Sequence, residues 1–268
     1  KEKSIALIEY IKELCDDSIF DIFSYSADYH NIKVILKGET LGAKRPDILM
    51  STGTISPKEM VRYVNERDAI RLTPNMLAAV GEALDNHART GDPQAIDFIC
   101  DRYCYMEIND AVEKNGNAFI KGYVALLIDT LNLKTCIRVR MMGKEWPYFS
   151  DLYIPGGNID EKTFTDTFDD DLLQVAERFE AYEIHEAVKG GLEALEATGS
   201  FTHLEKLCDD TVIRYIREAR FKTFGIETLF AFFVSNQMEI KSVRILMTGK
   251  LAGMEPALIK ERMRATYE

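Results

Sequence analysis

The sequence predicts an all-α fold made of three helical repeats. Two observations carry this prediction: apolar residues recur at helical spacing through most of the 268-residue chain, and a polar motif returns at intervals of roughly 100 residues. Residues 137–141 alternate between apolar and polar side chains, a pattern typical of strands. This stretch continues a helical run without a breaker, so we expect helix there as well.

The predicted helices follow one another along the chain. In the first of them, Ile22, Tyr25, Tyr29, Ile32 and Leu36 share one helical face. Helical spacing then recurs in seven segments separated by Gly, Pro, Asn or Asp, namely residues 72–90, 93–114, 118–142, 171–197, 202–222, 225–249 and 255–267.

The repeated motif is a set of polar residues and a glycine at fixed spacing. Residues 28–44 and 129–144 align without a gap at these positions. A third copy, residues 239–250, has Lys241 and Gly249 with one residue fewer between them. The shared residues of the first two copies are Asp28, Asn31, Lys33 and Gly42 in one, and Asp129, Asn132, Lys134 and Gly143 in the other.

The segments before the second and third copies also correspond. Gly81 pairs with Gly191, and Ile99–Asp101 pairs with Leu207–Asp209. Chance similarity between amphipathic helices is the alternative explanation, but such helices share composition more often than register. Each repeat is therefore predicted to be a helical bundle that ends in the Lys…Gly helix.

The repeats divide the chain at residues 1–50, 51–150 and 151–268. Three bundles related by approximate threefold symmetry form a natural closed arrangement. The first copy has a short lead-in before Asp28, so we expect the first repeat to be incomplete at its N-terminus. The chain opens on Lys1 without an initiator Met, which favours a start within a longer protein.

The composition excludes several classes of function. A formal charge of −11 and the absence of a basic patch argue against a nucleic-acid partner. No apolar run approaches the roughly 20 residues that a membrane-spanning helix needs. The five cysteines are an odd number scattered along the chain, which favours reduced thiols in the cytosol.

Glycine-containing motifs do not match known ligand loops. Gly143-Lys144 and Gly249-Lys250 lack the upstream Gly and the following hydroxyl of a phosphate-binding loop, and we interpret both as helix C-caps. The pairs Gly156-Gly157 and Gly190-Gly191 lack a dinucleotide-binding context, so they are predicted to serve the backbone.

Candidate metal and catalytic residues are equally isolated. Cys100 and Cys104 lie four apart on a helix but have no further ligand near them in sequence. Asp169–Asp171 precede a predicted helix, where carboxylates stabilise the helix dipole. The histidines, none of which belongs to a zinc motif, are His30, His87, His185 and His203. We therefore predict no catalytic, cofactor-binding or metal site.

The C-terminal stretch from Phe224 to Arg264 resembles the C-terminal signature of the C subunit of bacterial and archaeal V/A-type ATPases, the equivalent of the d subunit of the vacuolar enzyme. Asp28–Lys33, Asn132–Lys134 and Ile154–Ile159 resemble further stretches of that family in the same order. The sequence departs from the signature at residues 228 and 252, where Thr and Ala stand in place of Pro and Asn. The family's usual N-terminal portion has no counterpart here.

This resemblance implies a funnel of three pseudo-threefold-related bundles with no chemistry of its own. The funnel would sit on the cytoplasmic face of the membrane, on the proteolipid rotor ring, and receive the shaft formed by the D and F subunits. Its role would be to couple ATP turnover to proton or sodium transport as a peripheral, non-catalytic part of the central stalk without cofactors. Acidic residues such as Asp169–Asp171 would steer a basic partner.

Two other readings stay open. The chain would fit a free-standing helical scaffold that binds other proteins. An enzyme acting on a small molecule has support only from Cys100, Cys104 and the aspartate run, and would need a buried polar pocket with perturbed acids.

Overall fold

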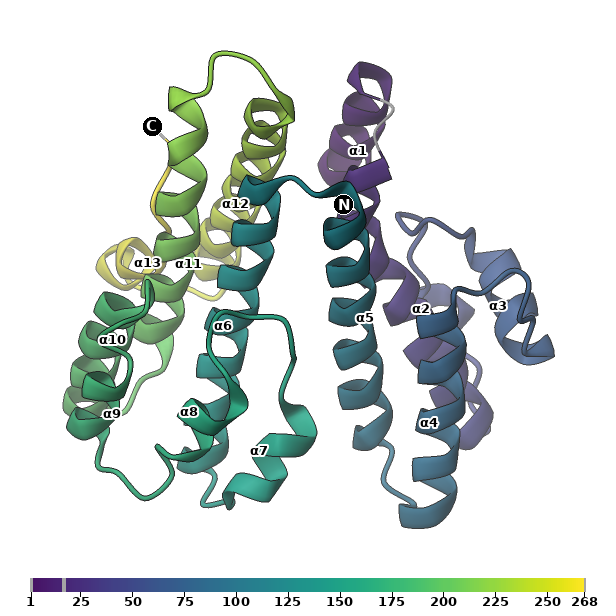
Figure 1. The fold of residues 1–268 in the computed structure, drawn as a ribbon, viewed down its shortest axis with the longest axis horizontal. Helices are drawn as coiled ribbons and strands as arrows, with labels where there is room; N and C mark the ends of the chain where they lie inside the picture. Colours follow the sequence, from purple (N-terminus) through teal and green to yellow (C-terminus); the bar gives the residue numbers. More distant parts are fainter. Residues whose placement is uncertain (1, 16–17, 268) are drawn as a thin grey trace. The chain divides into compact units, whose positions relative to one another are not determined.

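Helices make up the regular structure of this chain, and the described part contains no strand. The structure is a computed structural model that describes residues 2–15 and 18–267, without the side chains of residues 2–4, 12 and 173. In chain order the α-helices are α1 (Glu2–Leu14), α2 (Ile22–Thr40), α3 (Pro57–Glu66), α4 (Pro74–Thr90), α5 (Gln94–Asn115), α6 (Ala118–Met141), α7 (Trp146–Leu152), α8 (Glu161–Thr165), α9 (Leu172–Arg178), α10 (His185–Thr198), α11 (Thr202–Ile216), α12 (Ile226–Leu251) and α13 (Pro256–Arg262) (Figure 1).

The chain divides into two compact units. The α2–α5 unit runs from Cys15 to Asn117 and includes residues 151–156. The α6–α13 unit holds residues 118–150, the chain from Gly157 onward, and α1. The division into three repeats at residues 1–50, 51–150 and 151–268 is a separate question and stays a prediction.

The α2–α5 unit is built on an antiparallel hairpin of α4 and α5 (Figure 1). Thr73 caps the start of α4, where its hydroxyl accepts a hydrogen bond of 3.1 Å from the amide of Met76. Gly91 ends α4 with a φ of 69°, a left-handed conformation that glycine adopts without steric cost. Helix α2 packs on α5 through a face that includes Ile32 and Leu36, both fully buried.

The α6–α13 unit contains a second hairpin, α10 and α11, with the same turn. Gly199 ends α10 with a φ of 66°. The residue before each turn glycine bonds its own helix: the hydroxyls of Thr90 and Thr198 donate to the carbonyls of Asn86 and Ala194 at 2.9 and 2.7 Å. The following amide, at Asp92 or Ser200, then donates to that hydroxyl at 3.2 Å in both turns.

These matching turns fix the register of the two hairpins. Thr90 and Thr198 precede Cys100 and Cys208 by equal distances in sequence, so the pairing of those cysteine segments agrees with the turns. The same register places Ala83, not Gly81, opposite Gly191. The pairing of Gly81 with Gly191 was therefore wrong by two residues: Gly81 is exposed with open space around it, whereas Gly191 lies against Leu204 of α11.

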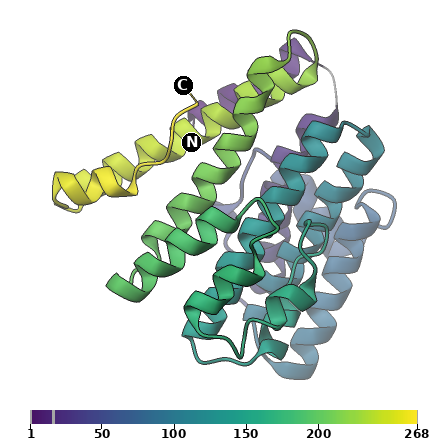
Figure 2. The same ribbon diagram turned by 60° about the vertical axis from the view of Figure 1, so that its left-hand side comes forward.

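The ends of the long helices correct a second detail. Gly143 caps α6 with a φ of 67°, as expected, and the amide of Lys144 donates to the carbonyl of Val139 at 3.2 Å. Gly249 is not a cap, because α12 continues to Leu251 and the left-handed residue that follows its end is Gly253, whose φ is 66°. Gly249 instead lets α13 approach, since a Cβ there would lie 2.8 Å from Ile259. Figure 2 shows α13 at the end of α12.

Most predicted helices are confirmed, including the alternating residues 137–141 within α6. Three segments were wrong in extent. Residues 171–197 form two helices, α9 and α10, because Phe179 turns out of the helical path and is fully buried against Phe164. Residues 217–221 continue α11 as a 3₁₀ helix, and α13 ends at Arg262, before residue 267. Helices α1, α3, α7 and α8 were not predicted.

Candidate functional site

The most specific polar structure in the α2–α5 unit surrounds Asp28 of α2. Its carboxylate accepts hydrogen bonds from the amide and hydroxyl of Thr54, at 2.9 and 2.7 Å, and from the amide of Ile55 at 3.1 Å. Burial raises the pKa of Asp28, although these three donors act against that rise. We call this arrangement the first aspartate–loop contact. It holds the loop before α3 onto α2.

Asp129 of α6 makes the same arrangement in the other unit. The amide and side-chain nitrogen of Asn158 and the amide of Ile159 each donate to its carboxylate at 3.1 Å. Burial raises the pKa of Asp129 to about 6, against the lowering effect of the three N–H donors. This second aspartate–loop contact holds the loop before α8 onto α6.

A glycine makes each contact possible. A Cβ on Gly53 would lie 2.1 Å from a carboxylate oxygen of Asp28, and a Cβ on Gly157 would lie 2.2 Å from one of Asp129. Neither position has space for a methyl group. The pattern is thus Asp on the helix and Gly-Thr-Ile or Gly-Asn-Ile in the loop, a sequence signal that was present but not recognised as a pair.

The cap glycine also assigns a third set of residues on α12. Gly253, Gly42 and Gly143 have φ values of 66°, 67° and 67°, so Gly253 can be matched to the other two. In this register the positions of Asp, Asn and Lys in the first two copies correspond to Glu239, Ser242 and Arg244. This register differs from the one predicted through Lys241 and Gly249, because Gly249 lies inside α12 and Gly253 follows its end. Ser242 is 9% exposed, consistent with the burial of Asn31 and Asn132 at the matching positions.

Ion pairs connect the long helices to the hairpins. Lys33 of α2 pairs with Asp101 of α5 at 2.6 Å. In the other unit, Asp209 of α11 accepts from Lys241 of α12 and from Arg264, both at 2.6 Å. Burial alone would raise the pKa of Asp209, but these cations together with Lys134 hold it below its ordinary value. Asp209 thereby joins α11, α12 and the C-terminal segment.

The two helical cysteines are buried thiols with raised pKa values. Cys100 and Cys104 are buried on α5, and burial raises the pKa of the Cys100 thiol to about 12 and that of Cys104 further. Across residues 2–15 and 18–267, no group of three His, Cys, Asp or Glu side chains could hold a metal ion. The thiols pack as small apolar side chains.

The aspartate run has structural partners at two of its three positions. Asp170 forms an ion pair with Arg178, whose Nη2 lies 2.9 Å from its carboxylate. Asp171 is the N-cap of α9 and completes a capping box with Gln174 at 2.9 Å. Asp169 is exposed. Asp169 has no ion pair and no capping role among the residues that the structure describes.

The remaining singled-out residues have backbone or packing roles. A Cβ at Gly156, where φ is 102°, would lie 2.0 Å from Asn109, and a Cβ at Gly190 would meet Leu207 of α11. His30 lies 3.1 Å from the carbonyl of Ile48, and His203 is partly exposed. The buried Nδ1 atoms of His87 and His185 have no hydrogen-bond partner within the described chain. Within the described residues, none of the four histidines belongs to a group of three side chains that could hold a metal ion.

Comparison with known proteins identifies the family of this chain. The model of the ATP synthase (C/AC39) subunit family matches residues 1–262. The chain belongs to this family. Among the family's curated members, it is 22% identical to the C subunit of the V-type sodium ATPase of Enterococcus hirae, over 98% of this chain and 80% of that protein.

Two archaeal members of the family show the same extent of similarity. The C subunit of the A-type ATP synthase of Thermoplasma acidophilum is 24% identical, over 88% of this chain and 73% of the relative. That of Desulfurococcus is 28% identical, over 90% of this chain and 67% of the relative. Membership in the ATP synthase (C/AC39) subunit family makes this chain a part of a rotary, ion-translocating ATPase.

Within this family member, none of the described helices is long and apolar enough to cross a bilayer. Buried Asp28, Asp129 and Asp209 join helices to loops or to other helices.

Proposed function

We propose that this chain is a non-catalytic coupling component of a rotary V/A-type ATPase. It is a socket that joins the shaft, made of the D and F subunits, to the proteolipid rotor ring at the cytoplasmic face of the membrane. In this proposal the three repeats, 1–50, 51–150 and 151–268, are pseudo-threefold-related bundles of a funnel. The observation that carries the proposal is the family match across almost the whole chain.

Physical features of the two units support this role. A coupling part has to resist twist, and both units bind a loop to a long helix through a buried carboxylate with three donors. Breaking such a contact leaves a buried charge without partners, so moving the loop away from the helix costs free energy. The negative net charge of this chain is complementary to a basic surface on a partner. The exposed Asp169 is one residue of this chain that could contact such a surface.

The test is affinity purification of the tagged protein from detergent-solubilised membranes, with mass spectrometry and an ATPase assay of the eluate. Recovery with proteolipid and shaft proteins in an ATP-hydrolysing complex supports the coupling role. Recovery alone, or with unrelated soluble proteins, would favour a free-standing helical scaffold instead.

A further inference from the structure

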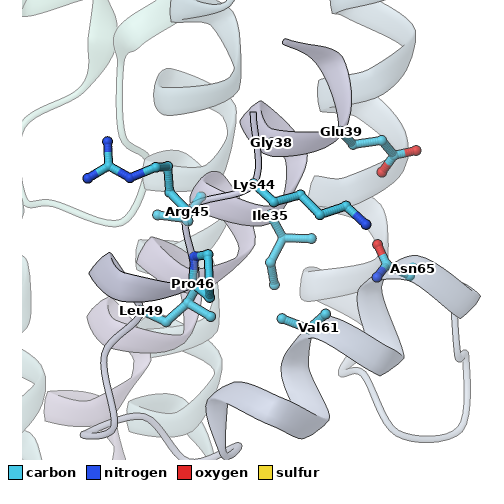
Figure 3. A pocket seen from close by; sticks show the side chains of 10 residues that line it. Ile35, Gly38, Glu39, Lys44, Arg45, Pro46, Leu49, Val61 and Asn65 are labelled. Atoms are coloured by element: carbon cyan, nitrogen blue, oxygen red, sulfur yellow. The ribbon is translucent and has the colours of Figure 1, made fainter. Parts of the chain in front are cut away.

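An apolar cavity of about 370 Å³ lies within the α2–α5 unit. Its walls come from the C-terminal half of α2, the segment 44–49 and α3. Figure 3 shows Ile35, Leu49 and Val61 around this space, with Pro46 beside them. The volume falls within the range of cavities that take up a bound group.

One cation at the rim of this cavity lacks a counter-charge. Glu39 pairs with Arg67 at 3.1 Å, and Arg45 pairs with Asp47 at 2.8 Å. Lys44 has no carboxylate partner among the residues that the structure describes. Its side chain extends from the segment 44–49 toward Asn65 of α3 (Figure 3).

The register of the two units matches the segment 44–49 beside this cavity with residues 145–150 of the α6–α13 unit. Gly42 and Gly143 cap α2 and α6, and Pro46 and Pro147 follow them at equal spacing. In that register Ile48 corresponds to Phe149.

The two side chains differ in what they do. Ile48 is 43% exposed, whereas Phe149 is fully buried. The Phe149 ring lies 5.7 Å from the ring of Phe164 on α8, the helix that follows the second aspartate–loop contact as α3 follows the first. The α6–α13 unit thus has a buried aromatic ring at this position, and the α2–α5 unit has a cavity beside it.

We propose that this cavity is a docking site for an aromatic side chain of a partner polypeptide that carries a carboxylate beside the ring. The ring takes the place that Phe149 occupies in the other unit, and the carboxylate pairs with Lys44. A protein side chain is favoured over a free small molecule because the residue that matches Ile48 in the other unit is a buried aromatic side chain. Leu41 and Met50, which flank the segment 44–49, are 60% and 37% exposed and extend the apolar surface.

The proposal rests on the proposed function only in naming the assembled ATPase as the place where the partner is found. A binding experiment on the full chain tests the docking site independently of assembly. Its probe is a peptide with the sequence of residues 145–152, which contains Phe149 between Glu145 and Asp151. Binding is followed through the NMR signals of the Ile35 and Val61 methyl groups.

We expect saturable peptide binding that Lys44→Gln weakens by about threefold to tenfold, as for one charge pair at a partly exposed site. Ile48→Phe should abolish binding, because it introduces the aromatic residue that is buried at the matching position of the other unit. Ile70→Phe is the matched control, since Ile70 is 90% exposed in the same unit, and it should leave binding unchanged. If Ile48→Phe unfolds the protein, Val61→Phe fills the cavity from α3 instead.

Three results of the peptide experiment would overturn the proposal. They are methyl signals that do not respond to the peptide, binding that is insensitive to both cavity-filling variants, and 3-phenylpropionate binding as tightly as the peptide. The last result would assign the site to a small carboxylate. In the purified complex, a photoreactive residue at position 65 should cross-link to a partner peptide containing an aromatic and an acidic residue; an intact complex without this cross-link also contradicts the proposal.

Discussion

Two aspartates define this protein at the scale of single residues. Asp28 and Asp129 are each buried on a long helix, and each accepts three hydrogen bonds from a loop. Burial disfavours the carboxylate while the donors favour it, and burial is the larger effect at both sites. The strength of both aspartate–loop contacts therefore depends on pH.

Asp129 gives a stability change with a definite sign. Its pKa rises from 3.8 to about 6 on folding, so the folded state binds the proton more tightly than the unfolded state. Its contribution to the free energy of unfolding is therefore fully present below pH 4 and is lost as pH rises through about 6. We expect the free energy of unfolding of the wild type, minus that of Asp129→Asn, to fall by on the order of 2 kcal/mol between pH 4 and pH 7.

Urea unfolding of both proteins across this pH range measures the difference. Asn at this position does not titrate, so other groups cancel in the subtraction. A difference that grows with pH would show that the N–H donors outweigh burial.

The loop glycines provide a second prediction. Gly53→Ala and Gly157→Ala place a methyl group against the Asp28 and Asp129 carboxylates, and each should lower the free energy of unfolding by about 1–3 kcal/mol. Gly81→Ala is the control, because the added methyl meets open space in the middle of α4 and should raise stability by about 0.5–1 kcal/mol. Chemical denaturation of the three variants decides this, and equal effects at all three positions would contradict it.

The sequence predicted some of these residues but not their contacts. The spacing of Asp28 and Asn31 matches that of Asp129 and Asn132 and was visible without a structure. The partners in the loops were not, because the loops differ in length and their backbone amides carry no side-chain signal. The structural role of the glycines depends on a close approach that only coordinates reveal.

The ends of helices carry the main lesson at the scale of elements. Helices with long, uninterrupted apolar spacing, such as α5 and α6, were placed within a residue or two. The boundary between α9 and α10 was missed because residues 179–184 contain neither Gly nor Pro; the helix stops there because Phe179 is buried against Phe164. Tertiary packing, not local sequence, ends that helix.

The register of α12 is testable through its two glycines. Gly253→Ala forces a left-handed backbone on alanine and should lower the free energy of unfolding by about 1 kcal/mol, whereas Gly253→Asn should cost less. Gly249→Ala should instead displace α13, because its methyl group meets Ile259.

Denaturation combined with hydrogen exchange separates the two effects. Faster exchange in residues 256–262 is expected for Gly249→Ala. If Gly249→Ala behaved like a cap variant, with no effect on α13, the register of the third copy would be wrong.

The C-terminal segment gives a further element-scale prediction. Arg264 is 7% exposed at its side chain and donates to Asp209, and the amide of Ala265 donates to Asp210 at 2.6 Å. Arg264→Met keeps much of the volume but leaves Asp209 with Lys241 as its remaining direct ion pair. We expect a loss of about 1–3 kcal/mol and faster amide exchange at Ala265. Unchanged exchange at Ala265 would show that the segment is held by other contacts.

At the scale of the whole molecule, the sequence predicted the fold class but not the surfaces that contact other subunits. Composition and helical spacing predicted an all-α protein, and the similarity across its length places it in the ATP synthase (C/AC39) subunit family. Partner surfaces could not be predicted, because contacts between different proteins of a complex leave no periodic pattern in one chain. The apolar cavity beside Lys44 depends on how α2, the segment 44–49 and α3 pack, which only the structure shows.

The central claim is that this protein couples ATP hydrolysis to ion movement without catalysing either. The most direct measurement is the ratio of ions transported to ATP hydrolysed in membrane vesicles from cells that lack the protein, with and without its re-expression. The account predicts that ATP hydrolysis persists in some form without the protein while transport is lost, and that re-expression restores transport. Transport that continues at the normal ratio in its absence would contradict the account.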